Sequence, residues 1–365
     1  MADIAATASR VRPRRPLSVF ETWPCWLFYA PIPFLWLYLA LRHRGLTLPV
    51  LANTAAPWSG FLGESKSEGL ALLGPTGRLH FAPGASFRSN ASGDRHDNGL
   101  RARAAMHEAG LEFPVVAKPD VGQNGAGVKI IRDGNALDGW LSAFPRDTKA
   151  ILQKYIGDEG EAGVFYVRRP RETHGRVVSL TLKYLPHVKG DGVSTLRELI
   201  LRDRRARHVA PLYFVRHRGR LDRVVPSGER VRLVSVGNHC RGAIFKNGAR
   251  HITPRMEAAF DTIAREIPGF CFGRFDVKFP TLRDLEQGKS FTILEINGGD
   301  AEMTHIWDAD ETLGRAYTTL FRQYRIAFEI GAENRARGYR PVAVRAFLAA
   351  WLRNRARLKA YSPEE

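Results

Sequence analysis

Two stretches near the C-terminal end of the chain carry its clearest strand pattern: Phe275-Asp276-Val277-Lys278-Phe279 and Phe291-Thr292-Ile293-Leu294-Glu295-Ile296-Asn297. In both, polar or charged residues alternate with apolar ones, which is the period of a β-strand. On the second strand this period places Glu295 and Asn297 on one face, with the intervening apolar residues on the other. If Asp276 lies on the neighbouring strand, three oxygen-bearing side chains meet on one surface.

This cluster of polar side chains has two explanations. Two carboxylates and an amide suit a hard cation such as Mg²⁺ that is held jointly with nucleotide phosphates. Without a cation such a cluster is costly to bury, and the alternative is an ion-pair network in which Arg274 neutralises the carboxylates. We favour the metal site because Arg274 and Lys278 can face phosphate groups instead. Asp276, Glu295 and Asn297 are therefore the predicted metal ligands.

A glycine-rich loop, residues 120–127, joins a predicted strand that ends at Lys118-Pro119 to a short strand at 128–131. Gly122, Gly125 and Gly127 would let the backbone close over phosphates with its N–H groups as donors, and Lys118 adds a cation. The loop is neither a Walker A loop nor a Rossmann fingerprint, because the Gly-Lys-Ser/Thr ending and the strand-to-helix context are absent. A glycine-rich hairpin turn without a ligand is the alternative.

The rest of the chain divides into four predicted segments. Strands near 113–119, 150–156, 163–167 and 177–184, with helices near 100–109, 135–144 and 196–201, predict an α+β fold with a small lid and a larger antiparallel core. The polar, turn-rich stretch 89–94 is the candidate linker. The segments are a divergent N-terminal lobe (1–95), a lid (96–156), a catalytic core (157–334) and a basic amphipathic C-terminal helix (335–365).

These motifs resemble the ATP-grasp carboxylate-amine ligases, especially D-alanine-D-alanine ligase and the ligase domain of cyanophycin synthetase. The likeness covers about 113–308. Residues 116–128 are similar to the family's ATP-binding lid, residues 151–156 to its hinge strand and residues 190–196 to a cyanophycin synthetase motif. The two polar strands are similar to the family's metal-binding motifs. The resemblance implies an ATP-grasp fold, ATP and Mg²⁺ as cofactors, and nucleotide binding by Lys118, Gly122, Gly125, Gly127, Gln153, Lys154, Tyr155, Ile156 and Glu161, with Glu161 on the ribose.

The sequence departs from the family in two places. The family has a further lysine upstream of the lid, yet residues 94–117 offer only Arg95, Arg101 and Arg103. The segment after Asn297, residues 298–305, lacks the small-Pro-Gly turn that holds substrates in the family. The second phosphate-binding cation and the identity of the substrates are therefore not predicted.

The expected reaction is activation of a carboxylate as an acyl phosphate, followed by transfer to an amine. It needs cations on the developing charge rather than a protein nucleophile. Lys118 and Lys183 would neutralise phosphates, Arg274 would stabilise the acyl phosphate, and His305 is a further candidate, although a lone loop histidine is more often a hydrogen-bonded surface residue. The alternatives are an ATP-grasp kinase that phosphorylates a small molecule and a non-catalytic ATP-binding protein at a membrane or nucleic-acid surface.

Composition leaves the partners open. The chain has 365 residues and a formal net charge of +18, which attracts phosphates, anionic substrates, nucleic acid or acidic lipids alike. We expect small-molecule or peptide carboxylate and amine substrates and no specific nucleic acid, and a homodimer stays open. Cys25, Cys240 and Cys271 show no metal or disulfide spacing. The absence of a secretory signal pattern after the N-terminal arginines also favours the cytoplasm.

Two apolar segments bear on membrane contact. Residues 23–41 are nearly free of charge, but Pro24, Pro31 and Pro33 argue against a spanning helix. A buried or partner-covered segment is favoured over an interfacial anchor, and a true span comes last. In the basic tail 335–359, the apolar run 347–352 fits a docked helix better than a lipid-binding one. Peripheral attachment to a membrane is therefore kept as an alternative.

Overall fold

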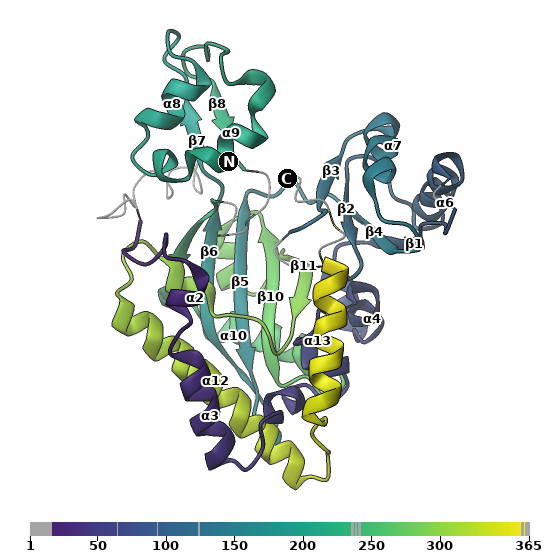
Figure 1. Cartoon of the computed structure of the whole chain (residues 1–365), viewed down its shortest axis with the longest axis vertical. Coiled ribbons are helices and arrows are strands. Elements are labelled where there is room, and N and C mark those ends of the chain that lie inside the picture. Colours follow the sequence, from purple (N-terminus) through teal and green to yellow (C-terminus); the bar gives the residue numbers. More distant parts are fainter. Residues whose placement is uncertain are drawn as a thin grey trace.

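The computed structural model describes residues 17–63, 65–92, 94–122, 125–234, 237, 239, 242–358 and 361. Its ribbon is built around a large central sheet, with a small sheet to one side and a small helical subdomain above (Figure 1). Parts of several predictions lie outside the described residues, namely Gln123 and Asn124 of the glycine loop, Cys240, Lys359 and the N-terminal arginines.

The central sheet is antiparallel, with strand order β11-β10-β5-β6-β9. The bounds of its strands are β5 Gly160–Val167, β6 Arg176–Tyr184, β9 Ile244–Asn247, β10 Phe272–Phe279 and β11 Thr292–Asn297. One face packs on α10 (Pro254–Glu266) through an apolar core that includes Phe260, Ile263 and Phe275. The predicted pairing of the two polar strands is confirmed, because Asp276 lies opposite Glu295 and Arg274 lies opposite Asn297.

The smaller sheet is the lid, with strand order β1-β4-β2-β3. Its elements are β1 Gly84–Arg88, α6 Arg95–Glu108, β2 Val115–Pro119, β3 Lys129–Ile131, α7 Gly134–Ala143 and β4 Lys149–Lys154. Helices α6 and α7 pack on it through a separate apolar core that includes Met106, Leu137 and Trp140. Each helix begins at an aspartate, Asp94 or Asp133, whose carboxylate accepts backbone N–H groups of the first turn.

The predicted boundary near residue 95 is wrong for the lid sheet. Strand β1 lies before that boundary, yet Gly84 to Arg88 pair with Gln153 to Lys149 and form one edge of the sheet. The expected linker 89–94, of which Gly93 lies outside the described residues, comes between β1 and α6 in the chain, and Ser89 donates a hydrogen bond to the Pro145 carbonyl at 2.8 Å. The strand is only five residues long, too short for its alternation to stand out from the surrounding turns.

A subdomain is inserted between β6 and β9. It consists of β7 His187–Lys189, α8 Leu196–Arg202, η3 Ala206–Val209, α9 Ala210–Arg216, η4 Arg218–Arg220 and β8 Arg230–Arg232. Strands β7 and β8 form a two-stranded sheet. The subdomain has its own apolar core, which includes Leu196, Ile200 and Tyr213.

The N-terminal lobe and the C-terminal helices surround the rest of the central sheet, some on the face opposite α10 and some, through Leu70, Leu72 and Leu73, on the α10 side. They comprise α2 Cys25–Phe28, α3 Ile32–Arg42, η1 Leu48–Leu51, η2 Pro57–Gly60, α4 Lys66–Ala71, α5 Pro75–His80, η7 Thr304–Trp307, α12 Leu313–Ala336 and α13 Val344–Leu358. The short helices η6 Ala249–His251 and α11 Leu282–Glu286 flank the core. Among the described residues, none of the helices has both the length and the apolar character to cross a bilayer. Helices and antiparallel sheets together confirm the predicted α+β class with a lid and a core.

Candidate active site

A cavity of about 760 Å³ lies between the lid sheet, the central sheet and the N-terminal lobe. It is lined by most of the residues that the sequence predicted for a nucleotide site: Lys118, Gly122, Gly125, Gln153, Lys154, Tyr155, Ile156, Glu161, Lys183, Arg274, Asp276, Glu295 and Asn297. These residues come from the glycine loop and from strands of both sheets. The lid and the core therefore contribute opposite walls of one site.

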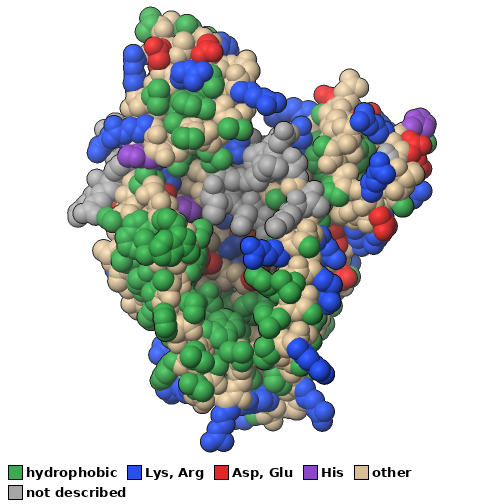
Figure 2. Space-filling view, viewed as in Figure 1, with side chains coloured by type: hydrophobic (Ala, Val, Ile, Leu, Met, Phe, Trp, Pro, Cys, Tyr) green, Lys and Arg blue, Asp and Glu red, His purple; other side chains and the backbone are tan. Residues whose placement is uncertain are grey.

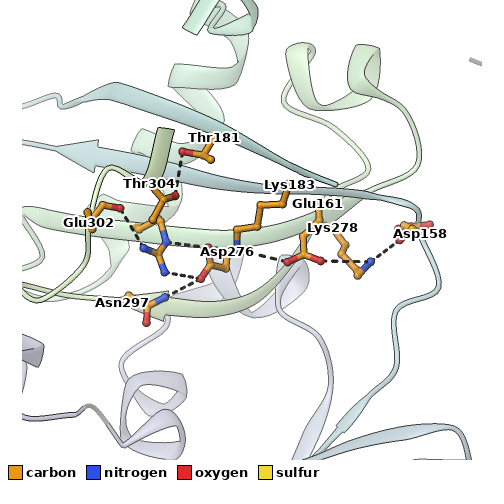
Figure 3. A network of polar contacts seen from close by, with 10 residues as sticks. Asp158, Glu161, Thr181, Lys183, Asp276, Lys278, Asn297, Glu302 and Thr304 are labelled. Atoms are coloured by element: carbon orange, nitrogen blue, oxygen red, sulfur yellow. Dashed lines mark hydrogen bonds and ion pairs between the residues drawn. The ribbon is translucent and has the colours of Figure 1, made fainter. Parts of the chain in front are cut away.

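The core wall is organised around the carboxylate of Asp276 (Figure 3). Its Oδ1 accepts hydrogen bonds from Lys183 Nζ and Arg274 Nε, both at 2.9 Å. Its Oδ2 accepts from an Arg274 terminal nitrogen and from Asn297 Nδ2, both at 3.0 Å. A carboxylate offers about four lone-pair positions, so Asp276 is fully hydrogen-bonded.

The network has clear effects on acid–base behaviour. Burial alone would raise the pKa of Asp276, but the charges of Arg274 and Lys183 and their hydrogen bonds bring the pKa well below its usual range. For Arg274, burial lowers the pKa, whereas Asp276 more than offsets this and the pKa is raised overall. Asp276 is therefore ionised and Arg274 is charged throughout the physiological range.

The network continues along β5 and β10 through Glu161. Lys183 Nζ lies 3.5 Å and Lys278 Nζ lies 3.9 Å from the oxygens of Glu161. Lys278 also donates to the Asp158 carbonyl at 2.7 Å (Figure 3). A Cβ on Gly237 would come within 2.1 Å of Glu161 Oε1. Glu161 is thus held at the cavity wall, and its binding to a ribose stays a prediction.

Glu295 is paired differently from Asp276. Its side chain keeps 33% of its surface exposed, and its Oε1 lies 3.3 Å from the Nζ of Lys66. Burial by itself raises the pKa of Glu295, whereas Lys66 and Lys118 lower it overall. The Lys66 ammonium also lies 3.5 Å from the carbonyl oxygens of Asp120 and Gly122, at the start of the glycine loop.

Lys66 supplies a cation that the sequence did not predict. The arginines considered for this role do not line the cavity, because they lie on or beside α6, and two of them pair locally: Arg101 with Asp97 and Arg103 with Asp138, each at 2.8 Å. Lys66 instead begins the six-residue helix α4, which Ser65 caps by accepting the Glu68 N–H. The pattern Ser65 to Glu68 was the available signal, since a serine followed three residues later by glutamate is typical of a helix start.

The lid wall presents Lys118 from β2. Its ammonium donates to Gln153 Oε1 at 2.8 Å and to the Leu294 carbonyl of β11 at 3.4 Å. In the described part of the chain no carboxylate pairs with it directly, and burial lowers the pKa of Lys118 to about 8. The Gln153 amide also reaches the Leu294 carbonyl, at 3.3 Å, so both lid side chains point towards the core strand that carries Glu295.

The glycine loop has the backbone geometry that glycine permits. Gly125 and Gly127 both have a φ of about 70°, a region that other residues rarely adopt. Gly127 does not line the cavity. Instead it packs on Pro119, where a Cβ would approach the Pro119 ring to 3.0 Å. Gly122 and Gly125 line the cavity and Gly127 shapes the turn behind them.

His305 is not among the residues that line the cavity. Its Nδ1 lies 2.7 Å from Ser179 Oγ and its Nε2 lies 3.5 Å from Thr319 Oγ1. Burial lowers the pKa of His305 to about 4, so the ring is neutral at physiological pH. His305 is therefore hydrogen-bonded, as the alternative expects, but it is partly buried rather than at the surface, and a catalytic role for it stays a prediction.

The sequence also missed the residues that close the far end of the cavity. Glu302 accepts hydrogen bonds from the Tyr29 hydroxyl at 2.6 Å and from Trp307 Nε1 at 2.7 Å. Its backbone carbonyl accepts from Arg274 at 3.1 Å. Tyr29 belongs to the segment 23–41, so the N-terminal lobe contributes a wall of the site. No motif in the sequence predicted the contact between Tyr29 and Glu302, which are 273 positions apart.

The side chains match a hard cation in chemistry, since they offer two carboxylates and an amide on one face of the sheet. Their present contacts are those of the ion-pair alternative, because all acceptor positions of Asp276 are used by Arg274, Lys183 and Asn297. In the described residues, at this site or elsewhere, no group of three or more His, Cys, Asp or Glu side chains is placed to hold a metal. Glu295, which is partly exposed, is the member best placed to accept a cation.

Comparison with known proteins gives structural matches only. No protein-family model and no curated protein matches the sequence. Among solved structures, the chain is similar to a bifunctional glutathione synthetase from Pasteurella multocida (16% identity, TM-score 0.37, covering 73% of this chain and 36% of that one). It is also similar to the VanG D-Ala:D-Ser ligase from Enterococcus faecalis (14% identity, TM-score 0.40, 74% and 64%) and to the ATP-grasp ligase PsnB in complex with a minimal precursor (11% identity, TM-score 0.34, 71% and 60%).

The chain spans less than two thirds of the length of each of these structures. Identities and TM-scores are low, so these likenesses carry no argument about this chain, and its α+β fold rests on its own elements. It has an antiparallel lid sheet, a larger antiparallel core sheet and a cation-lined cavity between them.

Proposed function

We propose that the protein is an ATP- and Mg²⁺-dependent ligase that activates a carboxylate as an acyl phosphate and joins it to an amine. The observation that carries this proposal is that basic side chains from three parts of the chain line one cavity, four of them beside Asp276, Glu295 and the glycine loop. Lys66 and Lys118 approach from the lobe and the lid, and Lys183 and Arg274 approach from the core. Such a set is suited to a polyphosphate whose charge shifts during transfer.

The chemistry proceeds in two balanced steps. A carboxylate oxygen of the first substrate attacks the γ-phosphorus of ATP, so that an acyl phosphate forms and ADP leaves. The amine of the second substrate then attacks the acyl carbon, inorganic phosphate leaves and the nitrogen gives up a proton. The chain's own cations would orient the phosphates and stabilise the negative charge that develops on their oxygens.

The positions of the cations suit contacts with different phosphate groups. Lys118 and Lys66 lie beside the glycine loop and would hold the phosphates of ATP. Arg274 and Lys183 lie on the core wall and would contact the transferred phosphoryl group. Glu295, Asn297 and Asp276 would hold Mg²⁺, which when bound neutralises phosphate charge; for Asp276 this requires the exchange of a contact with Arg274 or Lys183.

An ADP-release screen tests this function. Amino acids, hydroxy acids and short peptides are offered singly and in pairs with Mg²⁺ and ATP. We expect ADP release to require a carboxylate and an amine together, with one phosphate released for each ADP. ADP release with a hydroxyl compound alone, without free phosphate, would identify a kinase, and no ADP release with any pair would count against an enzyme.

A variant pair links the activity to the cavity. Lys66→Met should reduce ADP release strongly because it removes a cation beside the glycine loop. Lys129→Met on the neighbouring strand β3 is the matched control, because that lysine does not line the cavity. If both variants released ADP at the wild-type rate, the proposed role of Lys66 in binding phosphates would be rejected.

A further inference from the structure

Two helices carry apolar stripes that point away from the protein. On α3 and the preceding α2 the exposed side chains are Trp26, Leu27, Phe34, Leu37, Tyr38 and Leu41, and on α13 they are Val344, Leu348, Trp351 and Leu352. The series 34, 37, 38, 41 has the spacing of one helix face. The exposed fractions are large: 76% for Phe34, 74% for Trp26 and 71% for Leu41. A helix that docks on the protein through such a stripe would bury these side chains.

The two stripes belong to one face of the molecule, which we term the α3–α13 face. Aromatic contacts connect the helices through η2: Trp36 of α3 contacts Phe61 at 6.1 Å, and Trp58 contacts Phe347 of α13 at 6.4 Å between ring centroids. Figure 2 shows hydrophobic side chains gathered over α2 and α3 and again over α13, with basic side chains along the rim. A shallow apolar groove that includes Trp36 and Leu37 lies in the same region and shares Tyr29 and Tyr324 with the candidate active site.

The two segments that form this face carry charge of a single sign. Residues 22–63 and 334–358 contain no Asp or Glu, and the exposed arginines among them are Arg42, Arg44, Arg337, Arg340, Arg345, Arg353, Arg355 and Arg357. The nearby carboxylates of α12, Glu329 and Glu333, pair with Arg169 instead. Arg355 lies over the ring of Trp351 at 5.4 Å, so an arginine and an aromatic ring share one site at the helix surface.

We propose that the α3–α13 face binds an anionic lipid surface. Aromatic and aliphatic side chains beside arginines match the interfacial and headgroup layers of such a membrane. A second copy of the chain fits poorly, since two basic rims would face each other in a symmetric dimer. Nucleic acid would match the arginines but would leave the apolar stripes in water. Bound in this way, the protein places the Tyr29 side of its cavity next to the membrane.

Sedimentation with vesicles tests the proposal. The full-length protein is mixed with vesicles of phosphatidylcholine alone, or of equal parts phosphatidylcholine and phosphatidylglycerol, at low and high salt. We expect binding to the phosphatidylglycerol vesicles that weakens as salt rises. Phe34→Ser with Leu41→Ser should weaken it by at least about tenfold, and Arg353→Gln with Arg357→Gln by about fivefold per arginine.

Matched controls use residues of other surfaces. Leu79→Ser changes a leucine of α5 that is equally exposed, and Arg204→Gln with Arg207→Gln changes exposed arginines of the inserted subdomain. These controls should leave vesicle binding unchanged, and all variants should keep the wild-type melting temperature and ADP release in solution. The proposal is overturned by absence of binding to phosphatidylglycerol vesicles at low salt, or by equal loss in the control variants. Dimerisation that Phe34→Ser abolishes, or tight DNA binding that it leaves intact, would likewise overturn it.

Discussion

The two walls of the cavity carry similar cations but pair them in different ways. On the core wall, Asp276 accepts four hydrogen bonds, three of them from Arg274 and Lys183, and Glu161 is a second carboxylate beside Lys183. On the lid wall, the ammonium of Lys118 contacts an amide and a carbonyl, and burial lowers its pKa. A fully paired network is rigid without a ligand, whereas a buried cation without a direct carboxylate gains most from an anion. We infer that the core wall is assembled in advance and that the lid wall binds the phosphates.

Removing the lid cation should have the largest effect. Lys118→Met should lower ADP release by about 100-fold or more, because a preorganised cation at the phosphates is lost. Its stability to urea should be unchanged or higher, since a buried ammonium is replaced by an apolar side chain of similar size. Lys129→Met is the control. If Lys118→Met released ADP at the wild-type rate, the lid wall would not be the phosphate site.

On the core wall, replacing the Asp276 carboxylate by an amide should change the free energy of unfolding. Asp276→Asn leaves Arg274 and Lys183 buried with a neutral partner, so unfolding free energy should fall by about 3 to 5 kcal/mol. Glu295→Gln should cost less than about 1 kcal/mol, because Glu295 is partly exposed and has one ion pair at 3.3 Å. Urea denaturation measures both values.

The same two variants also test the metal. If Asp276, Glu295 and Asn297 hold Mg²⁺, folded Glu295→Gln should show turnover lower by orders of magnitude and a higher requirement for magnesium. Near-normal turnover in folded Glu295→Gln and Asp276→Asn would reject the metal assignment and leave the ion-pair network as their role.

The low pKa of Lys118 predicts opposite pH dependences for activity and stability. Because its pKa in the folded protein is about 8, below the usual 10.5, kcat/KM for ATP should decline above about pH 8 as the cation loses its proton. Between about pH 8 and 10.5 the unfolded chain binds more protons at this residue than the folded one, so its contribution to stability rises with pH. In Lys118→Met both contributions should disappear. A wild-type kcat/KM that stays flat up to pH 10 would contradict this.

The smallest effect is expected at His305. His305→Asn should leave ADP release within about twofold, because its ring contacts Ser179 and Thr319 outside the cavity. A pH profile of kcat that lost a limb in this variant would instead show that the histidine takes part in catalysis.

Local sequence patterns predicted the parts of the fold that depend on short-range periodicity. The strand pair with Asp276 and Glu295, the glycine hairpin and helices α6, α7 and α8 follow from the alternation and spacing of apolar residues, whereas α10 and α12 were not predicted. Strand β1 was missed because five residues give too short an alternation, and its place in the lid depends on pairing with β4 far along the chain.

Site residues on the same strand or on neighbouring strands could be predicted from the sequence. Site residues that meet only through tertiary packing could not. Lys66 reaches Glu295 from a six-residue helix with no periodic pattern. Tyr29 reaches Glu302 from the opposite end of the chain. Residues 23–41 are buried only in part, since Phe28 and Leu39 are buried whereas Trp26 and Phe34 are exposed, and interfacial anchoring stays a prediction.

Hydrogen exchange with and without ATP and Mg²⁺ tests the central claim most directly. Our account predicts that ATP slows exchange in the lid strands β2, β3 and β4, because phosphates bound by Lys66 and Lys118 hold the lid against the core. Exchange in β10 should change less, and exchange in the inserted subdomain helices α8 and α9 should not change. Unaltered exchange of the lid strands at saturating ATP would contradict the account.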